Sequence, residues 1–236
     1  MDFDEEALQI VRETRLLIDQ YDAWLYDEFT PYVGQRIIEV GCGLGNLLRH
    51  LASREMVVGI EPSAETVVEV QRAFANTPSV RIVCGSITDP SILSLSDYGF
   101  DTAISLNVFE HIDDDELAMA NTHDLLQPQG RFVLIVPAHA WLYGTMDRSI
   151  GHYRRYTKRM LSEKMARAGF EMVQLKYINL LGALGWWLNG RLLHRSVPPV
   201  GQLELFNRIV PGLRAIEGLG EVPFGISVMA VGKRNN

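Results

Sequence analysis

Short apolar runs alternate along the chain with longer stretches in which apolar residues recur every three or four positions. The short runs predict buried strands, and the longer stretches predict amphipathic helices. The predicted strands lie at residues 36–40, 56–60, 80–83, 102–106 and 131–136. The predicted helices between them lie at residues 46–54, 63–75, 90–95 and 114–126. This alternation indicates an α/β fold with a doubly wound, mostly parallel sheet.

The two ends of the chain depart from this alternation. Residues 5–28 have the apolar spacing of a helix that stops near Pro31. After Pro137 the pattern predicts a helix over 157–168 and two closing strands, 170–177 and 226–231, that flank an irregular apolar insertion at 178–223. Two such strands suit an antiparallel hairpin at the edge of a parallel sheet. We expect a single domain over residues 1–236, because the insertion is too small and too apolar to form another one.

The residues that follow the first predicted strand carry the most informative motif, Glu39-Val40-Gly41-Cys42-Gly43-Leu44-Gly45-Asn46. A strand, a glycine-rich turn and a helix bring backbone N–H groups close to a ligand at the helix N-terminus. A dinucleotide fingerprint would place its third glycine where this chain has Asn46. Glu61 ends the second strand 20 residues after Gly41, where a carboxylate can accept both ribose hydroxyls of an adenine nucleoside. The spacing favours S-adenosylmethionine over NAD.

The loop after the third predicted strand is a second candidate cofactor contact. It reads Cys84-Gly85-Ser86-Ile87, so Ser86 could offer a hydrogen bond to an adenine ring and Ile87 an apolar face. The same Gly-Ser pair is also common in ordinary turns.

Four motifs together give the chain a family resemblance. They are E-V-G-C-G-L-G at 39–45, V-V-G-I-E-P at 57–62, D-T-A-I-S-L-N-V-F-E-H-I at 101–112 and L-L-Q-P-Q-G-R-F-V-L-I-V-P at 125–137. With these motifs the chain resembles a class I S-adenosylmethionine-dependent methyltransferase of the type that modifies small molecules. The resemblance covers roughly residues 35–137.

The resemblance implies a Rossmann-like, seven-stranded sheet of order 3-2-1-4-5-7-6 with strand 7 antiparallel. It also implies a set of cofactor-binding residues: Glu39, Gly41, Gly43, Gly45 and Asn46 around the amino-acid end, Glu61 at the ribose, Pro62, Ser86 and Ile87 at the adenine, and Asn107 and Val108 on the methionine side. Ser86 departs from the family pattern, because many relatives carry Asp there. Residues 1–30 resemble the N-terminal lid of such enzymes, although a helix packed on the sheet fits them as well.

The acceptor is expected at the segment 138–156, since ligands of open α/β sheets bind beyond the carboxyl ends of the strands. This segment is dense in His, Tyr, Arg and Asp side chains. Methyl transfer to a hydroxyl requires positioning and proton removal, for which the candidate catalytic residues are His139, His152, Asp147 and His111. The candidate substrate contacts are Tyr143, Arg154, Arg155 and Tyr156. A basic, solvated helix start is the alternative interpretation of the arginines.

Residues 180–193 are apolar nearly all round and include Trp186 and Trp187. Four interpretations fit them: a lid over an apolar acceptor, a dimer face, a helix lying in a membrane interface, or a buried core element. If the segment is exposed, a lipid-linked acceptor is favoured over a fully soluble one.

Composition and charge argue against several kinds of partner and cofactor. The formal net charge of −7 argues against a nucleic-acid partner. The two cysteines, Cys42 and Cys84, lack metal-ligand spacing, and we expect no metal because no carboxylate cluster suitable for Mg²⁺ is visible. The acidic N-terminus differs from a signal peptide, so the chain is expected to be cytoplasmic.

The leading hypothesis is an S-adenosylmethionine-dependent methyltransferase that acts on a small or lipid- or sugar-linked hydroxylated acceptor. A nicotinamide-dependent oxidoreductase is the first alternative, because Gly41, Gly43 and Glu61 suit it equally. A binding module that keeps the cofactor without catalysis is the second.

Overall fold

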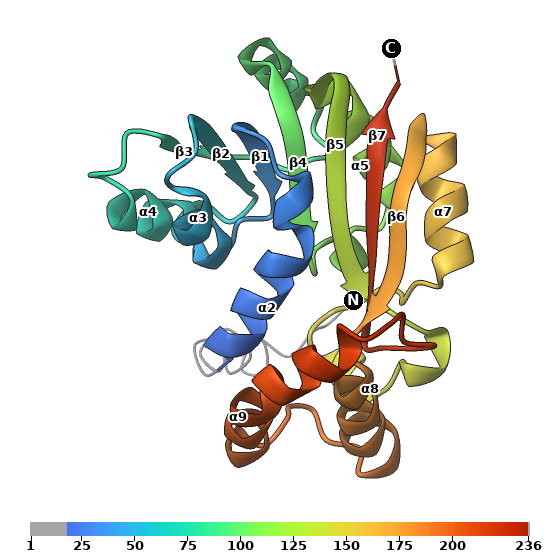
Figure 1. Cartoon of the computed structure of the whole chain (residues 1–236). Helices are drawn as coiled ribbons and strands as arrows, with labels where there is room; N and C mark the ends of the chain where they lie inside the picture. The colour runs from blue at the N-terminus through green and yellow to red at the C-terminus, as the bar shows by residue number, and fades with distance from the viewer. Residues whose placement is uncertain (1–17, 236) are drawn as a thin grey trace.

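A seven-stranded sheet with the order β3-β2-β1-β4-β5-β7-β6 forms the centre of the molecule. The computed structural model describes residues 18–235 and is drawn in Figure 1. Strand β7 runs antiparallel to both of its neighbours, and the other pairs are parallel. The strands are β1 (Arg36–Val40), β2 (Met56–Glu61), β3 (Val80–Cys84), β4 (Phe100–Leu106), β5 (Leu126–Pro137), β6 (Phe170–Ile178) and β7 (Ser227–Arg234). The strand order and the antiparallel seventh strand that the resemblance implies are therefore confirmed.

The sheet is covered on both faces, and the alternation of side chains along each strand assigns them to two apolar clusters. Ile37 belongs to one cluster with Trp24, Leu48 and Val133, whereas its neighbour Ile38 belongs to the other cluster. The first cluster includes helices α2, α3 and α4, and the second includes helices α5 and α7. Burial on both faces explains why the strands read as continuous apolar runs in the sequence.

The helices agree with the predicted positions over the first two thirds of the described chain. The α-helices are α2 (Asp19–Phe29), α3 (Asn46–Leu51), α4 (Ala64–Ala73), α5 (Asp115–Leu125), α6 (Thr145–Ser149), α7 (Lys158–Arg167), α8 (Leu180–Trp187) and α9 (Val200–Glu217). Helical segments of the 3₁₀ and π types are η2 (Thr30–Tyr32), η3 (Pro90–Tyr98), η4 (Phe109–His111), η5 (Ala140–Leu142) and η6 (Leu188–Leu192). The predicted helix at 90–95 is the 3₁₀ helix η3. The part of the predicted N-terminal helix before residue 18 lies outside the described residues.

The start of β5 differs from its prediction. The strand begins at Leu126, because Leu126 already pairs with Phe100 of β4. Residues 127–130, which lie between the predicted helix and the predicted strand, are an irregular part of β5, where Gln129 has a φ of 68° and the register to β4 shifts between Phe100 and Thr102.

The prediction that the insertion is irregular is wrong, because the insertion forms the two α-helices α8 and α9. Asn179 begins α8, and its side chain accepts a hydrogen bond from the Gly182 N–H at 2.7 Å. Glu217 at the end of α9 accepts hydrogen bonds from the N–H groups of Asn179 and Leu180, so the two helices are joined at their ends. The sequence of α8 has no polar face and therefore gives no helical period. In α9 the internal Pro211 argues against a continuous helix, so the pattern did not reveal either helix.

Helices α8 and α9 lie together at one end of the molecule, beyond the carboxyl ends of β4 and β5 (Figure 1). This is the edge at which open α/β sheets bind ligands. The last residue of the 138–156 segment is fixed to the same edge, because Ala138 and Tyr156 form a parallel bridge and the Tyr156 hydroxyl donates to Asp115 Oδ2 at 2.8 Å. The fold therefore places the segment 138–156 between the sheet and the two helices of the insertion.

Candidate active site

The glycine turn between β1 and α3 has the backbone conformation that its sequence requires. Gly41, Gly43 and Gly45 have φ values of 75°, 49° and 79°, which side chains rarely tolerate. A Cβ atom at Gly41 would lie 2.5 Å from Val108 Cγ2, whereas one at Gly43 would meet no atom of residues 18–235 within 4 Å. The turn is thus packed at one end against Val108 and has open space at Gly43.

Two glutamates flank this turn. Glu61 accepts hydrogen bonds at 3.1 Å from the N–H groups of Gly43 and Ser63. Glu39 is buried, and its Oε2 atom has no hydrogen-bond partner among the described residues. Burial, together with the charge of Glu61, raises the pKa of Glu39 well above its usual range. A buried carboxylate oxygen without a partner beside a glycine turn suits a cationic or hydrogen-bond-donating ligand group.

A cavity of about 500 Å³ begins at the end of β4 and extends between α2, α6, α8 and α9. Its wall is mainly apolar, with Tyr21 from α2 and Trp186 from α8 among the lining side chains. Apart from Tyr21, its ionisable lining residues follow the ends of β4 and β5, beside Asn107: Glu110, His111, His152 and Arg155. The lining also includes uncharged polar residues: Asn179, Asn189, Ser196, Gln202 and Ser227. Asn107 itself has a φ of 53°, a conformation that non-glycine residues keep only where the surroundings enforce it.

The carboxylate of Asp147 lies behind this wall and is fully buried. Its donors are His152 Nδ1 at 2.8 Å, Arg155 Nε at 2.7 Å, the Gly144 N–H at 2.9 Å and Trp186 Nε1 at 3.1 Å. Burial alone raises the pKa of Asp147, but the hydrogen bond from His152 and the charge of Arg155 outweigh it and hold the pKa below its usual range. The His152 bond fixes which nitrogen faces Asp147, so Nε2 is directed toward Glu110.

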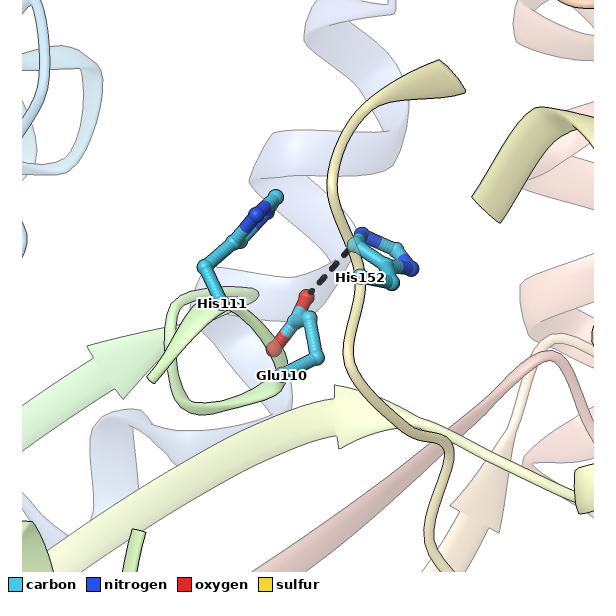
Figure 2. Close-up of side chains that lie close together, drawn as sticks. All are labelled: Glu110, His111 and His152. Carbon is cyan, nitrogen blue, oxygen red and sulfur yellow. Dashed lines mark ion pairs between the residues drawn. The ribbon is translucent and has the colours of Figure 1, made fainter. Parts of the chain in front are cut away.

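Glu110 is a buried acid in the cavity wall. Its side chain is fully buried, and neither carboxylate oxygen has a hydrogen-bond partner in the described part of the chain. The nearest ion-pairing atom is His152 Nε2, 3.7 Å from Oε1, as Figure 2 shows. Burial raises the pKa of Glu110 to about 7, with the nearby His152 and Arg155 charges opposing the rise.

His111, the next residue on the same turn as Glu110, completes this group. The two imidazole rings meet edge to face with their centroids 4.7 Å apart. Desolvation by the cavity wall lowers the pKa of His111 to about 4, and the charge of His152 adds to this shift, whereas a hydrogen bond to the Gly151 backbone opposes it. At neutral pH His111 is therefore uncharged and offers a nitrogen lone pair.

Comparison with known proteins identifies the family of the chain. A family model described as a methyltransferase domain matches residues 14–175. The chain belongs to the methyltransferase domain family. Its fold is that of the class I enzymes, and the cofactor is S-adenosylmethionine, so the nicotinamide alternative is not supported.

Individual relatives are distant. The chain is 27% identical over 161 residues to a ubiquinone biosynthesis O-methyltransferase of Azorhizobium caulinodans, an alignment that covers 61% of this chain and 62% of the relative. It is 29% identical over 153 residues to an uncharacterized 37.1 kDa protein in transposon TN4556 of Streptomyces fradiae, over 63% of this chain and 43% of that protein. The chain thus spans less than two thirds of the length of these relatives.

The fold is shared more widely than the sequence. The crystal structure of an S-adenosylmethionine-dependent methyltransferase from Mesorhizobium loti superposes with a TM-score of 0.59 at 16% identity, covering 91% of this chain and 97% of the other. The [4+2]-cyclase SpnF superposes with a TM-score of 0.57 at 16% identity, over 95% of this chain and 80% of that one. The similarity to these two structures shows the fold alone.

The structure brings some of the predicted acceptor residues together and separates others. His111, His152 and Arg155 line the cavity, and Asp147 supports two of them. His139 is not among the lining residues; its ring lies 4.5 Å from that of Tyr177, and its Nε2 is buried without a partner among the described residues. Arg154 does not reach the cavity lining, since it pairs with Asp115 at 2.8 Å.

The two tyrosines predicted as substrate contacts use their hydroxyl groups for hydrogen bonds within the protein. The Tyr143 hydroxyl donates to the His152 carbonyl oxygen at 2.7 Å, and Tyr156 is buried at Asp115. Conversely, sequence reasoning missed Glu110, although an acid directly after a buried strand is the signal that could have indicated it.

Removal of the Asp147 carboxylate should destabilise the folded protein. We expect Asp147→Ala to lower the free energy of unfolding by about 3–5 kcal/mol, because it leaves the buried Arg155 charge unpaired. Urea denaturation followed by circular dichroism measures this loss. Glu163→Ala is the control, since Glu163 pairs with Arg159 at the surface and its loss should leave the midpoint nearly unchanged. Equal midpoints for both variants would contradict this account of Asp147.

Proposed function

We propose that the protein transfers a methyl group from S-adenosylmethionine to a hydroxyl group of an amphipathic, lipid-linked acceptor. The observation that carries this proposal is the mainly apolar cavity in which the carboxylate of Glu110 and the imidazoles of His111 and His152 lie together beside Asn107. An apolar wall suits the hydrocarbon part of an acceptor, and convergent polar groups at one end suit its reacting hydroxyl. The similarity to ubiquinone biosynthesis O-methyltransferases supports O-methylation.

The glycine turn and its flanking acids would hold the cofactor. Glu39, with its unpartnered buried oxygen, and the turn from Gly41 to Asn46 would receive the amino-acid end. Glu61 would accept the ribose hydroxyls, because a carboxylate that takes one bond on each oxygen keeps lone pairs for more. Pro62, Ser86 and Ile87 would border the adenine, and Asn107 and Val108 the methionine side. When bound, the cofactor supplies a methyl group on a positively charged sulfur.

The cavity residues would position the acceptor hydroxyl and take up its proton. His152 is held by Asp147 with Nε2 toward the cavity side, and the neighbouring His111 and Glu110 enlarge the set of proton acceptors. A positioned proton acceptor matched to neutral pH accelerates such a transfer by about 10²–10⁴-fold. Arg155, packed 4.9 Å over the Trp186 ring, fixes the wall against which the acceptor would lie.

The surface around the cavity supports an acceptor with an apolar tail. Most of the exposed large hydrophobic side chains of the described residues come from the insertion: Leu181, Leu184, Trp187, Leu188, Leu192, Leu193, Val200, Leu205, Ile209, Ile216 and Leu219. Leu181, Leu205 and Ile209 are at once exposed and part of the cavity lining. The cavity therefore opens onto an apolar surface, so an acceptor chain could pass from that surface into the cavity without crossing water.

The charge of this surface favours a membrane over a second copy of the chain. Residues 180–219 contain four arginines and two glutamates, in a chain with a net charge of −7. A basic apolar surface on an acidic protein is complementary to anionic lipid and lies flat in a membrane interface. None of the described helices is long and apolar enough to cross a bilayer, so the contact we infer is peripheral.

Loss of the Glu61 carboxylate should weaken cofactor binding. We expect Glu61→Ala to raise the dissociation constant of S-adenosylhomocysteine by about 10–100-fold, because hydrogen bonds to a charged group contribute about 1.5–3 kcal/mol. Isothermal titration calorimetry measures this change. Glu65→Ala, at an exposed position in the first turn of α4, is the control and should bind normally. Unchanged binding by Glu61→Ala would remove Glu61 from the proposed site.

Methyl transfer should depend on the acceptor chain and on His152. With tritiated S-adenosylmethionine, we expect kcat/KM to rise with alkyl chain length across hydroxylated acceptors that share one headgroup, and mass spectrometry should find the methyl group on oxygen. His152→Ala should lower kcat by about 10²–10⁴-fold. His123→Ala is the control, because His123 lies in the last turn of α5 at the opposite end of β5. Methylation of nitrogen or carbon alone, or none in an enzyme that binds the cofactor, would refute the proposal.

Binding to lipid should depend on the exposed apolar side chains of α8. The double variant Leu184→Glu with Trp187→Glu should reduce co-flotation with anionic vesicles at least tenfold, since burial of a large apolar side chain contributes about 1.5–3 kcal/mol. Val173→Glu, on exposed β6, is the matched control. If the wild-type protein does not co-float with the vesicles and light scattering shows a dimer mass that depends on protein concentration, the surface is a dimer face instead.

A further inference from the structure

We propose that Glu110, His111 and His152 form a binding site for one divalent transition-metal ion at the polar end of the cavity. One carboxylate and two imidazoles converge there, and one ligand atom of each lies within 4.8 Å of the other two. Figure 2 shows the Glu110 carboxylate directed at His152, with His111 next to Glu110 on the same turn.

The distances suit an ion after small side-chain rotations. Bonds from zinc to imidazole nitrogen or carboxylate oxygen are about 2.0–2.2 Å, so the ligand atoms of one ion lie within about 4.4 Å of one another. His152 Nε2 and Glu110 Oε1 are already 3.7 Å apart, too far for a hydrogen bond and suitably spaced for two ligands of the same ion.

The strongest independent observation is the Glu110 carboxylate itself. It is fully buried, and neither oxygen accepts a hydrogen bond from the described residues. A buried carboxylate without donors is costly unless a positive partner compensates it. The arginine of this wall, Arg155, directs its Nε to Asp147 and its terminal nitrogen to the Ala138 carbonyl oxygen instead. A cation between Glu110 and the two histidines would supply the missing partner.

Both histidines also have the outer contacts that metal-binding histidines typically have. His152 uses Nδ1 for the Asp147 carboxylate, which leaves Nε2 for an ion, and His111 hydrogen-bonds the Gly151 backbone. A second contact of this kind fixes the ring orientation and increases the basicity of the ligating nitrogen. Because Asp147 is held in turn by Gly144 and Trp186, the ring of His152 is fixed from three segments of the chain.

The ligand types indicate which ions fit. Imidazole suits zinc, iron, copper and nickel, whereas magnesium and calcium prefer sites built wholly from oxygen. Three protein ligands facing a cavity leave coordination positions open, as in catalytic rather than structural metal sites. The role of the ion rests on the proposed function: at the cavity end next to Asn107 it would lower the pKa of an acceptor hydroxyl. With the ion bound, the His152 Nε2 lone pair is occupied and cannot take the hydroxyl proton, so the proton would pass to solvent water instead of to His152.

Metal binding can be tested on the whole chain without any acceptor. We expect protein stripped with a chelator and dialysed against micromolar Zn²⁺ to retain about one ion per chain by plasma mass spectrometry, and none with Mg²⁺ at the same concentration. Co²⁺ in place of Zn²⁺ should give visible absorption bands of mixed nitrogen and oxygen ligation. Glu110→Gln, His111→Ala and His152→Ala should each lower the Zn²⁺ affinity at least 100-fold, and Asp147→Asn should lower it by about 10–100-fold.

Two controls separate this inference from loss of fold and from the proposed function. His123→Ala, at the far end of β5, should keep full Zn²⁺ binding, and the circular dichroism spectrum of each ligand variant establishes that it is folded. S-adenosylhomocysteine binding by calorimetry tests the cofactor site separately. Stoichiometric zinc without methyl transfer would sustain the metal site and refute the function. If the folded wild-type protein transfers methyl groups, binds neither Zn²⁺ nor Co²⁺ and keeps its activity in the presence of a chelator, the metal site is refuted and the proposed function is sustained.

Discussion

The buried carboxylate of Asp147 is the interaction on which the geometry of the acceptor side depends. It accepts hydrogen bonds from α6, from the segment that carries His152 and Arg155, and from Trp186 of α8. A buried charge is costly unless all its partners are in place, so the three segments are stable together or not at all. The carboxylate therefore selects one arrangement of the cavity wall, and with it the direction of His152.

The two halves of the site are built by different means. At the glycine turn, where we propose that the cofactor binds, the backbone conformation sets the shape: three glycines have positive φ, and Glu61 accepts a hydrogen bond from the Gly43 N–H. On the acceptor side, the shape comes from side chains of distant segments. A local backbone motif can serve one cofactor across a family, whereas walls made of separate segments can change with the acceptor.

The insertion between β6 and β7 joins the cavity to the molecular surface. Helices α8 and α9 supply much of the cavity wall and also the exposed apolar side chains, and Leu181, Leu205 and Ile209 belong to both sets. A helix with a single apolar face buries that face by packing it against the protein core. Helices α8 and α9 carry apolar side chains both toward the cavity and toward the molecular surface, which indicates that an apolar environment also contacts them from outside. For this reason the lipid-linked acceptor and the membrane contact are proposed together.

The sequence by itself determined the sheet, its strand order through the family resemblance, and the glycine turn with Glu61, because these depend on residues close together in the chain and on regular periods. Only the tertiary structure decided that residues 180–192 and 200–217 are helical. The first stretch is apolar nearly all round and leaves no helical period to detect, and Pro211 interrupts the second. It also decided which histidines meet. His111 and His152 are distant in sequence yet edge to face in space, whereas His139 lies against Tyr177. The cluster around the unpartnered Glu110 exists only where separate segments meet at the ends of β4 and β5.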